Sequence, residues 1–494
     1  MSDSHPFSFS DPAVLKVLRG ASGTSINYIG SALSHFQAEP VMYGTDQHML
    51  PPVSDWEFEL RRSLSGRPSH IKAPKQLEEF PRFLQKKDLY LSRSHALGET
   101  MFRFSFDFPR LSPRAGEFNR TLMRKYVQLL ARVRANGQEP MVTLYHFTLP
   151  LSLTRRNSQD GISHGAWEDD RILEHFRFYI GEVVKALRDT DFLRSAMDEE
   201  QIGLDMQERF LSEGLVRYFM TLNEPMNVFV NGYLTGLFPP FRRLNFFRRR
   251  KIIDRMVYAH DMAFAELKNL SMSLPIARQV QVGIGHSWQY FDGTFGGILH
   301  RFGNEYSFKR FERNGLYSDF LGLHYYFRFT ASVFNWDFKS RDFSNRPDFG
   351  DVYPPGILSV LERMHTVHPS KNIIVSEFGF AGRTDRRRPY WLLETLRYVI
   401  EAKHRGVPVT GLLLWSLVSN FEWDVGMGLA KFGLFSEKEL SAPLTPPETG
   451  VRSWEVWCAV TQALTHPTPE SLAVLETYYK KAKQQYNEAK SHKS

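Results

Sequence analysis

The segment VRYFMTLNE (216–224) is an apolar run that ends in an amide and a carboxylate. A short run rich in Val, Phe, Tyr and Leu predicts a buried strand over 216–222. Asn223 and Glu224 follow directly, at the carboxyl end of that strand. Seven other short apolar runs have the same form, namely 26–34, 100–106, 140–146, 280–286, 319–325, 372–376 and 411–416.

Longer amphipathic segments separate these runs. In RTLMRKYVQLLARVRANG (120–137), apolar residues recur at helical spacing, and Gly137 stands where the cap after a helix belongs. The segments 172–189 and 388–406 follow the same pattern. The chain therefore alternates strands with helices, as serial βα units do.

Eight strands that are each followed by a helix close naturally into a barrel. We therefore predict an α/β fold, a single (β/α)8 TIM barrel with long βα loops. The barrel is placed at 25–465, between an N-terminal extension over 1–24 and a charged C-terminal helical tail over 466–494.

Polar and aromatic side chains follow most of the predicted strands. In (β/α)8 barrels the carboxyl ends of the strands carry the active site, so a functional barrel should place reactive groups there. The residues at or near these ends are Arg103, Tyr145, His146, Asn223, Glu224, His324, Tyr325, Tyr326, Glu377, Trp415, Glu422 and Trp423.

Glu224 and Glu377 end the fourth and seventh strands, which lie nearly opposite each other in a ring of eight. Two carboxyl groups that flank a ligand are what glycosidic cleavage needs, since one protonates the leaving oxygen and the other attacks the anomeric carbon. Arg103 and Tyr326 would stabilise the charge of the nucleophile, and Asn223 could bind the sugar 2-hydroxyl. The separation of the carboxyl groups would distinguish retention from inversion, and the sequence alone does not give it.

Composition limits the remaining function classes. The 494 residues carry a formal net charge of +8 and a single cysteine, Cys458, so neither an internal disulfide nor a cysteine-based metal site can form. No nucleic-acid module is recognisable. We expect no signal peptide and no transmembrane helix, and hence a soluble cytoplasmic protein. Six basic residues and three phenylalanines gather at 241–251, and two interpretations stand: peripheral contact with membrane lipid, or a solvated loop and helix face.

Six motifs resemble glycoside hydrolase family 1, the β-glucosidase and β-galactosidase family, over residues 25–436. TLNEP (221–225) resembles its acid/base motif, and IIVSEFG (373–379) its nucleophile motif. The other four are GSALSHFQAEP (30–40), FRFSFDFPRLSP (102–113), VTLYHFTLP (142–150) and WSLVSNFEW (415–423) with KFGLF (431–435). TDRRRPY (384–390), GVPVTG (406–411) and DVGMGLAKFGL (424–434) are similar to the plant galactolipid galactosyltransferase-like branch.

The resemblance implies a retaining O-glycosyl hydrolase without metal or organic cofactor. Glu224 would be the acid/base and Glu377 the nucleophile, with Arg103, Tyr326 and His324 beside the nucleophile. The substrate-binding residues that it implies are Gln37, His146, Asn223, Tyr326, Trp415, Glu422 and Trp423.

Several positions depart from the family pattern. Phe378 and His324 replace the usual Asn residues, and Phe108 and Phe147 replace Trp. These changes bear on the preferred sugar more than on the chemistry. His324 allows two interpretations, a group that titrates near neutral pH beside Glu377 and a neutral hydrogen-bonded imidazole.

The sequence thus predicts a retaining β-glycosidase acting on β-D-glucosides or β-D-galactosides in carbohydrate metabolism. Two alternatives remain, a transglycosidase acting on glycolipids of the galactolipid type and a non-catalytic sugar-binding protein on the same scaffold. The sugar, linkage, aglycone and oligomeric state are not determined by the sequence.

Overall fold

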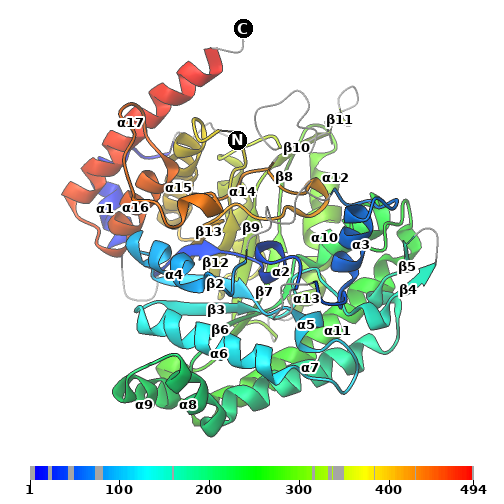
Figure 1. The fold of residues 1–494 in the computed structure, drawn as a ribbon. Helices are drawn as coiled ribbons and strands as arrows, with labels where there is room; N and C mark the ends of the chain where they lie inside the picture. The colour runs from blue at the N-terminus through cyan, green and yellow to red at the C-terminus, as the bar shows by residue number, and fades with distance from the viewer. Residues whose placement is uncertain are drawn as a thin grey trace.

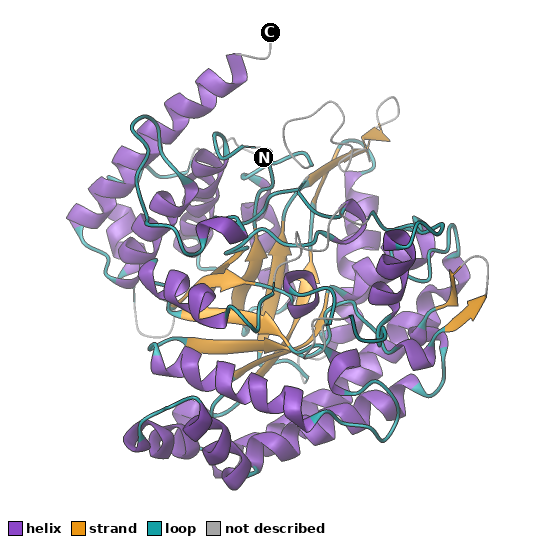
Figure 2. Ribbon diagram, viewed as in Figure 1, coloured by secondary structure: helices purple, strands orange, loops and turns teal. Residues whose placement is uncertain are grey.

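A computed structural model describes residues 6–20, 25–42, 49–72, 82–157, 161–313, 317–331, 336–337, 350–382, 384–428 and 430–491. Eight parallel strands form a closed barrel in the order β1-β2-β3-β6-β7-β9-β12-β13, with β13 pairing back to β1. Figures 1 and 2 show the strands at the centre with helices around them. The strands are β1 (Tyr28–Ala32), β2 (Met101–Ser105), β3 (Glu139–Thr143), β6 (Tyr218–Asn223), β7 (Gln281–Ser287), β9 (Phe320–Tyr325), β12 (Asn372–Phe378) and β13 (Val409–Trp415).

A helix follows each barrel strand, so the predicted (β/α)8 fold is confirmed. Each predicted strand coincides with a barrel strand, although β3 ends at Thr143 and leaves Tyr145 and His146 in the following loop. The helices are α4 (Lys87–Ala96), α6 (Arg120–Ala135), α7 (Ile172–Arg188), α11 (Arg249–Lys268), α13 (Tyr306–Phe311), α14 (Gly356–Val367), α15 (Arg388–His404) and α16 (Ser453–Thr465).

Several βα loops carry structure of their own, which the sequence patterns did not predict. After β6 the chain forms α10 (Pro225–Phe229) and a π-helical turn, η4 (Val230–Leu234). After β7 come β8 (Tyr290–Asp292), α12 (Gly296–His300) and a second π-helical turn, η8 (Arg301–Glu305). β8 pairs with β10 (Arg328–Ala331), which follows β9. These elements stand beyond the carboxyl ends of the barrel strands.

The barrel interior changes character along its axis. Its lower layer is apolar and includes Met101, Met141, Met220 and Ile374, all buried. Side chains alternate along a strand, so the next inward position on β2 after Met101 is Arg103. The layer of side chains that contains Arg103 is therefore polar, and it lies directly above the apolar layer.

The two ends of the chain pack on the same side of the barrel. α1 (Pro12–Leu18) contacts α15, and α17 (Pro469–Ser491) contacts α15 and α16. Figure 1 shows α17 running outward from this group of helices. Part of the predicted N-terminal extension, residues 1–5 and 21–24, lies outside the described residues. Within the part of the chain that the structure describes, no helix is both long and apolar enough to cross a membrane.

Candidate active site

Arg103 links several polar residues at the mouth of the barrel through its guanidinium group. Its Nη1 donates to Glu377 Oε1 at 2.5 Å and to the Ser376 carbonyl at 2.9 Å. Its Nη2 donates to Asn223 Oδ1 at 2.7 Å. One planar guanidinium thus fixes side chains from the fourth and seventh strands, and it leaves the amide nitrogen of Asn223 as that residue's donor for a ligand.

Glu377 is buried and accepts hydrogen bonds at both carboxyl oxygens. An irregularity in strand register between Val375 and Glu377 turns the side chain toward the barrel axis. Its second oxygen, Oε2, accepts from the Tyr326 hydroxyl at 2.7 Å. Burial, together with the charges of Glu377 and Glu224, holds the pKa of Tyr326 well above its ordinary value, so the phenol stays a proton donor.

Glu224 stands where β6 turns into α10, in a left-handed conformation with φ 44°. Such a conformation is costly for a non-glycine residue and is concentrated at functional sites. Asn227 Nδ2 donates to Glu224 Oε2 at 2.6 Å, and His324 Nδ1 lies 2.8 Å from Glu224 Oε1. Glu224 thus contacts an amide and a neutral imidazole, whereas Glu377 contacts the Arg103 cation.

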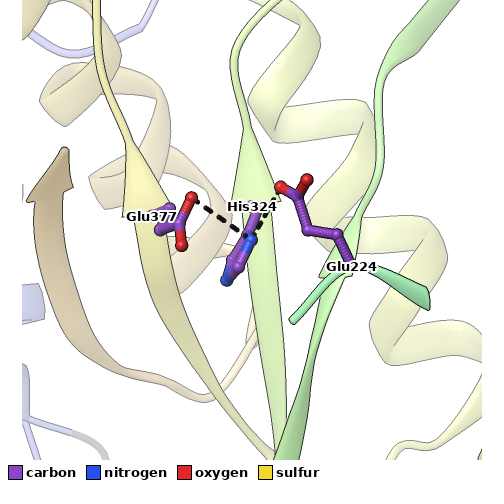
Figure 3. Close-up of side chains that lie close together, drawn as sticks. All are labelled: Glu224, His324 and Glu377. Atoms are coloured by element: carbon purple, nitrogen blue, oxygen red, sulfur yellow. Dashed lines mark hydrogen bonds and ion pairs between the residues drawn. The ribbon is translucent and has the colours of Figure 1, made fainter. Parts of the chain in front are cut away.

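The two glutamates face each other across His324 (Figure 3). His324 Nδ1 lies 3.4 Å from Glu377 Oε2, and one oxygen of each glutamate lies within 4.8 Å of the other. Retaining glycosidases hold their carboxyl groups about 5–5.5 Å apart, whereas inverting enzymes need about 6.5–9.5 Å to admit a water. The approach of these oxygens fits the retaining arrangement.

His324 is a neutral imidazole in this site. Burial, with the neighbouring charge of Arg103, lowers its pKa to about 3 although Glu377 opposes the shift. The structure therefore favours the neutral interpretation over titration near pH 7. Room for the ring comes from Gly285 on β7, where an added Cβ would lie 2.5 Å from His324 Nε2.

Five of the predicted sugar-binding residues lie close to one another: Gln37, His146, Trp415, Glu422 and Trp423. Gln37 Nε2 donates to Glu422 Oε2 at 3.3 Å, and the rings of Trp415 and Trp423 lie 5.7 and 6.0 Å from His146. Gln37 Oε1 and His146 Nδ1 are buried and have no hydrogen-bond partner among the residues that the structure describes. Burial and the charge of Arg103 hold the pKa of His146 well below its ordinary value, so it is neutral. Unpaired buried polar atoms are costly, and sugar hydroxyls would satisfy them.

These residues open into a pocket of about 370 Å³ with two unlike walls. The barrel wall contains the charged groups, Glu224, Glu377, Glu422 and Asp424, together with Gln37, His146, Asn223, Tyr326, Trp415 and Trp423. The loop wall is mainly apolar, with Met226, Val230, Leu234, Leu237, Phe238, Phe291, Leu299, Phe302, Phe327 and Phe329. The polar residues of the loop wall, such as Asn231 and Thr235, are uncharged.

Three contributors to the site were not predicted from the sequence. Asn227 binds Glu224, and its spacing of three residues after Glu224 on a helix was the available signal. Gln289 Oε1 accepts from the backbone nitrogen of Phe327 at 2.8 Å and so orients the segment that carries Tyr326. Gly285 gives no sequence signal, because its role depends on a ring from another strand.

Glu224, His324 and Glu377 are also the group of acidic, histidine and cysteine residues, among those described, that could hold a metal ion. Both oxygens of Glu377 already accept hydrogen bonds, and the Arg103 guanidinium adds a positive charge beside them. The donor set therefore fits paired carboxylate chemistry better than a bound cation.

The fold and the paired carboxylates define a (β/α)8-barrel protein built like a glycosidase. The model of glycosyl hydrolase family 1 matches residues 81–207, and the predicted resemblance to this family is confirmed.

Relatives and solved structures agree with this result. The chain is 26% identical to the chloroplastic galactolipid galactosyltransferase SFR2 of Arabidopsis thaliana over 72% of this chain and 54% of that protein. It is also 26% identical to rat Klotho, over 69% of this chain and 33% of Klotho. The chain thus spans about half the length of the plant relative and about a third of Klotho. A β-glycosidase from Pyrococcus horikoshii superposes with a TM-score of 0.66 at 22% identity, covering 93% of this chain and 98% of the other, and shares the fold.

Proposed function

We propose that this protein is a retaining β-glycosidase that cleaves β-D-glucosides or β-D-galactosides through a covalent glycosyl-enzyme intermediate. The observation that carries the proposal is the contrast between two neighbouring glutamates. Glu377 accepts from a guanidinium and a phenol, while Asn227 donates an amide N–H to Glu224 and the neutral His324 ring lies beside it. A nucleophile must stay ionised and an acid must keep its proton, so these surroundings support Glu377 as nucleophile and Glu224 as acid/base.

In the first step, Glu377 Oε2 or Oε1 attacks the anomeric carbon while Glu224 gives its proton to the leaving oxygen. The glycosidic bond breaks, and an ester bond forms between the sugar and Glu377. In the second step, Glu224 takes a proton from water, whose oxygen attacks the anomeric carbon and releases Glu377. The sugar leaves with its original β configuration.

His324 acts in this scheme as a positioning residue. The negative charge resides on Glu377 in the free enzyme and on Glu224 in the glycosyl-enzyme. His324 Nδ1 is 3.4 Å from the first carboxylate and 2.8 Å from the second, so a neutral ring with a proton on Nδ1 can donate to either. One donor thereby supports the charge at both stages.

A second candidate, transfer of the sugar to another glycoside or lipid, shares the first step. The apolar loop wall favours it, because an acceptor with an apolar portion can compete with water for that surface. The Arabidopsis relative is a galactolipid galactosyltransferase, which agrees with such a reaction. Hydrolysis and transfer differ at the second step: water attacks the glycosyl-enzyme in hydrolysis, and the acceptor attacks it in transfer.

Rescue of a nucleophile variant tests the proposal. We expect the wild type to turn over an aryl β-glucoside, β-galactoside or β-fucoside, and Glu377→Gly to lose at least ~10³-fold in kcat. Azide fills the space left by the carboxylate and attacks from the same face, so the rescued product should be the α-glycosyl azide.

Glu401→Gln and Glu377→Gln form a matched pair, since Glu401 is also a buried glutamate but lies on α15 and pairs with Arg405. Only Glu377→Gln should lose activity. A well-folded wild type that binds these glycosides without turning them over would move the assignment to a sugar-binding protein.

A further inference from the structure

Four large apolar side chains lie exposed near the mouth of the pocket. Leu244, Phe246 and Phe247 are 74%, 54% and 98% exposed, and Ile298 on α12 is 65% exposed. We call these four residues the rim patch. Isolated apolar residues on a surface are ordinary, but adjacent aromatic and aliphatic groups beside a binding pocket indicate a contact surface.

The backbone holds part of the rim patch outward at a cost. Leu244 has φ 52° and Phe241 has φ 57°, conformations that disfavour residues with large side chains. Phe241 stacks on His70 at 4.4 Å, whereas Leu244 projects into solvent. Neither the strained conformation nor the exposure of Leu244 contributes to the stability of the isolated chain.

The rim patch is continuous with the apolar loop wall of the pocket. The backbone nitrogen of Leu244 donates to the carbonyl of Leu234, whose side chain lines the pocket. Arg249, two residues after Phe247, lies over the ring of Phe302 at 4.8 Å, and Phe302 also lines the pocket. Ile298 precedes Leu299, another lining residue. The rim patch and the apolar loop wall therefore lie on neighbouring or directly bonded segments of the chain.

Positive charge surrounds these apolar groups. Residues 241–253 contain six basic side chains and no acidic one. The carboxylates that face this segment are Glu168, Asp170 and Asp254, at 3.5 Å or more from Arg242, Arg248, Arg250 and Lys251. Arg243, and Arg301 next to α12, are exposed and form no ion pair with an acidic residue of the described chain. Exposed apolar side chains among basic residues are suited to the interface of an anionic bilayer, where the apolar groups enter the acyl boundary and the basic groups bind the headgroups.

We infer that the rim patch inserts into the surface of a membrane that carries anionic lipids and so presents the headgroup sugar of a membrane glycolipid to the pocket. The sugar enters toward the barrel wall, and the apolar portion of the lipid stays against the loop wall. The docking surface stands independently of catalysis, while the glycolipid as substrate rests on the proposed function.

Vesicle co-sedimentation tests the docking surface without any turnover. The full chain should bind vesicles of phosphatidylcholine mixed with phosphatidylserine more tightly than vesicles of phosphatidylcholine alone, and added salt should weaken the binding. Phe246→Ser/Phe247→Ser should lower the partition coefficient at least ~10-fold, because two aromatic side chains lose their burial in the interface.

A matched variant controls for general loss of apolar surface. Met272 and Ile276 are 81% and 87% exposed, and they lie between α11 and β7, at the opposite end of the barrel. Met272→Ser/Ile276→Ser should leave vesicle binding unchanged. Arg243→Glu/Arg250→Glu should abolish the preference for phosphatidylserine.

Three results would overturn the inference. The first is a wild type that fails to bind the anionic vesicles at low salt, and the second is a Phe246→Ser/Phe247→Ser variant that binds them as well as the wild type. The third is a wild type that self-associates in light scattering and becomes monomeric in that variant, which would assign the rim patch to a second copy of the chain. A protein that binds the vesicles yet cleaves no glycoside would contradict the proposed function alone.

Discussion

The two walls of the pocket are built from different parts of the chain. The barrel wall comes from strand ends and the loops that follow them, and Glu377, Glu224 and Glu422 on it accept hydrogen bonds from Arg103, Asn227 and Gln37. The loop wall comes from α10, η4, η8 and the segments around β8 and β10. It offers mainly Leu, Val and Phe, and no charge.

This difference separates catalysis, which depends on the barrel wall, from discrimination among aglycones, which depends on the loop wall. A bond-breaking site needs groups fixed within fractions of an ångström, and a closed barrel supplies such rigidity. Apolar contact is less directional, so loops with short π-helical turns suffice for it. Changes in the barrel wall should therefore alter kcat for all substrates, and changes in the loop wall should alter discrimination among aglycones.

After loss of the nucleophile, the largest effect is expected at the acid/base. Glu224→Ala should lower kcat/KM for alkyl β-glucosides by about 10²–10⁴-fold, because proton donation to the leaving oxygen is lost. Aryl glucosides whose phenols are strong acids should be affected much less, since they leave without a proton. Steady-state kinetics on the two substrate types measures this contrast.

Azide sharpens this test, because it should attack the glycosyl-enzyme of Glu224→Ala and give the β-glycosyl azide, opposite to the α product of Glu377→Gly. Equal losses on both substrate types would contradict the role of Glu224. Glu401→Ala, on the outer helix α15, is the control for removal of a buried glutamate.

The barrel wall was largely predictable, and the loop wall was not. Glu224, Glu377 and Arg103 follow from strand ends and motif spacing, because the carboxyl ends of parallel strands must meet at one face of a barrel. In the structure Arg103 binds Glu377 and Asn223, and His324 lies between Glu377 and Glu224. Their distances could not be predicted, since these depend on the irregular register at Glu377 and the left-handed backbone at Glu224.

The loop wall depends on irregular segments whose positions are set by tertiary packing. Phe291 and Phe329 are in contact because β8 pairs with β10, and no periodicity in the sequence predicts that pairing. Similarly, the role of Gly285 appears only when the His324 ring is placed beside it. The cluster at 241–251 was visible as composition, but its continuity with the pocket needed the fold.

A smaller effect is expected at His324. His324→Ala removes a donor shared by both carboxylates and should lower kcat about 10-fold, with the acid limb of the pH profile of kcat/KM displaced to higher pH. His324→Asn keeps a donor and should retain more activity. A loss of kcat that leaves the pH profile in place would indicate a packing role only.

Stability should respond to the same residue. The folded pKa of His324 is about 3, below its ordinary value of 6.5, so the unfolded chain binds one more proton between these values. The free energy of unfolding contributed by this group is therefore fully present above pH 6.5 and falls as the pH falls toward 3. Denaturation of wild type and His324→Asn across this window should show a steeper loss in the wild type, at most ~1.4 kcal/mol per pH unit.

The smallest effect is expected on the loop wall, and it should depend on the substrate. Leu234→Ser exchanges an apolar lining group for a polar one and leaves the backbone carbonyl that binds Leu244 in place. For a long-chain alkyl β-glucoside, kcat/KM should fall about 5–10-fold through a higher KM, as the loss of one apolar contact predicts. For methyl β-glucoside the change should be under about twofold, because its aglycone does not reach the loop wall. Leu234→Met conserves apolar volume and should match the wild type on both. An equal loss on both glucosides would mean that Leu234 supports the barrel wall, and the division between the two walls would then fail.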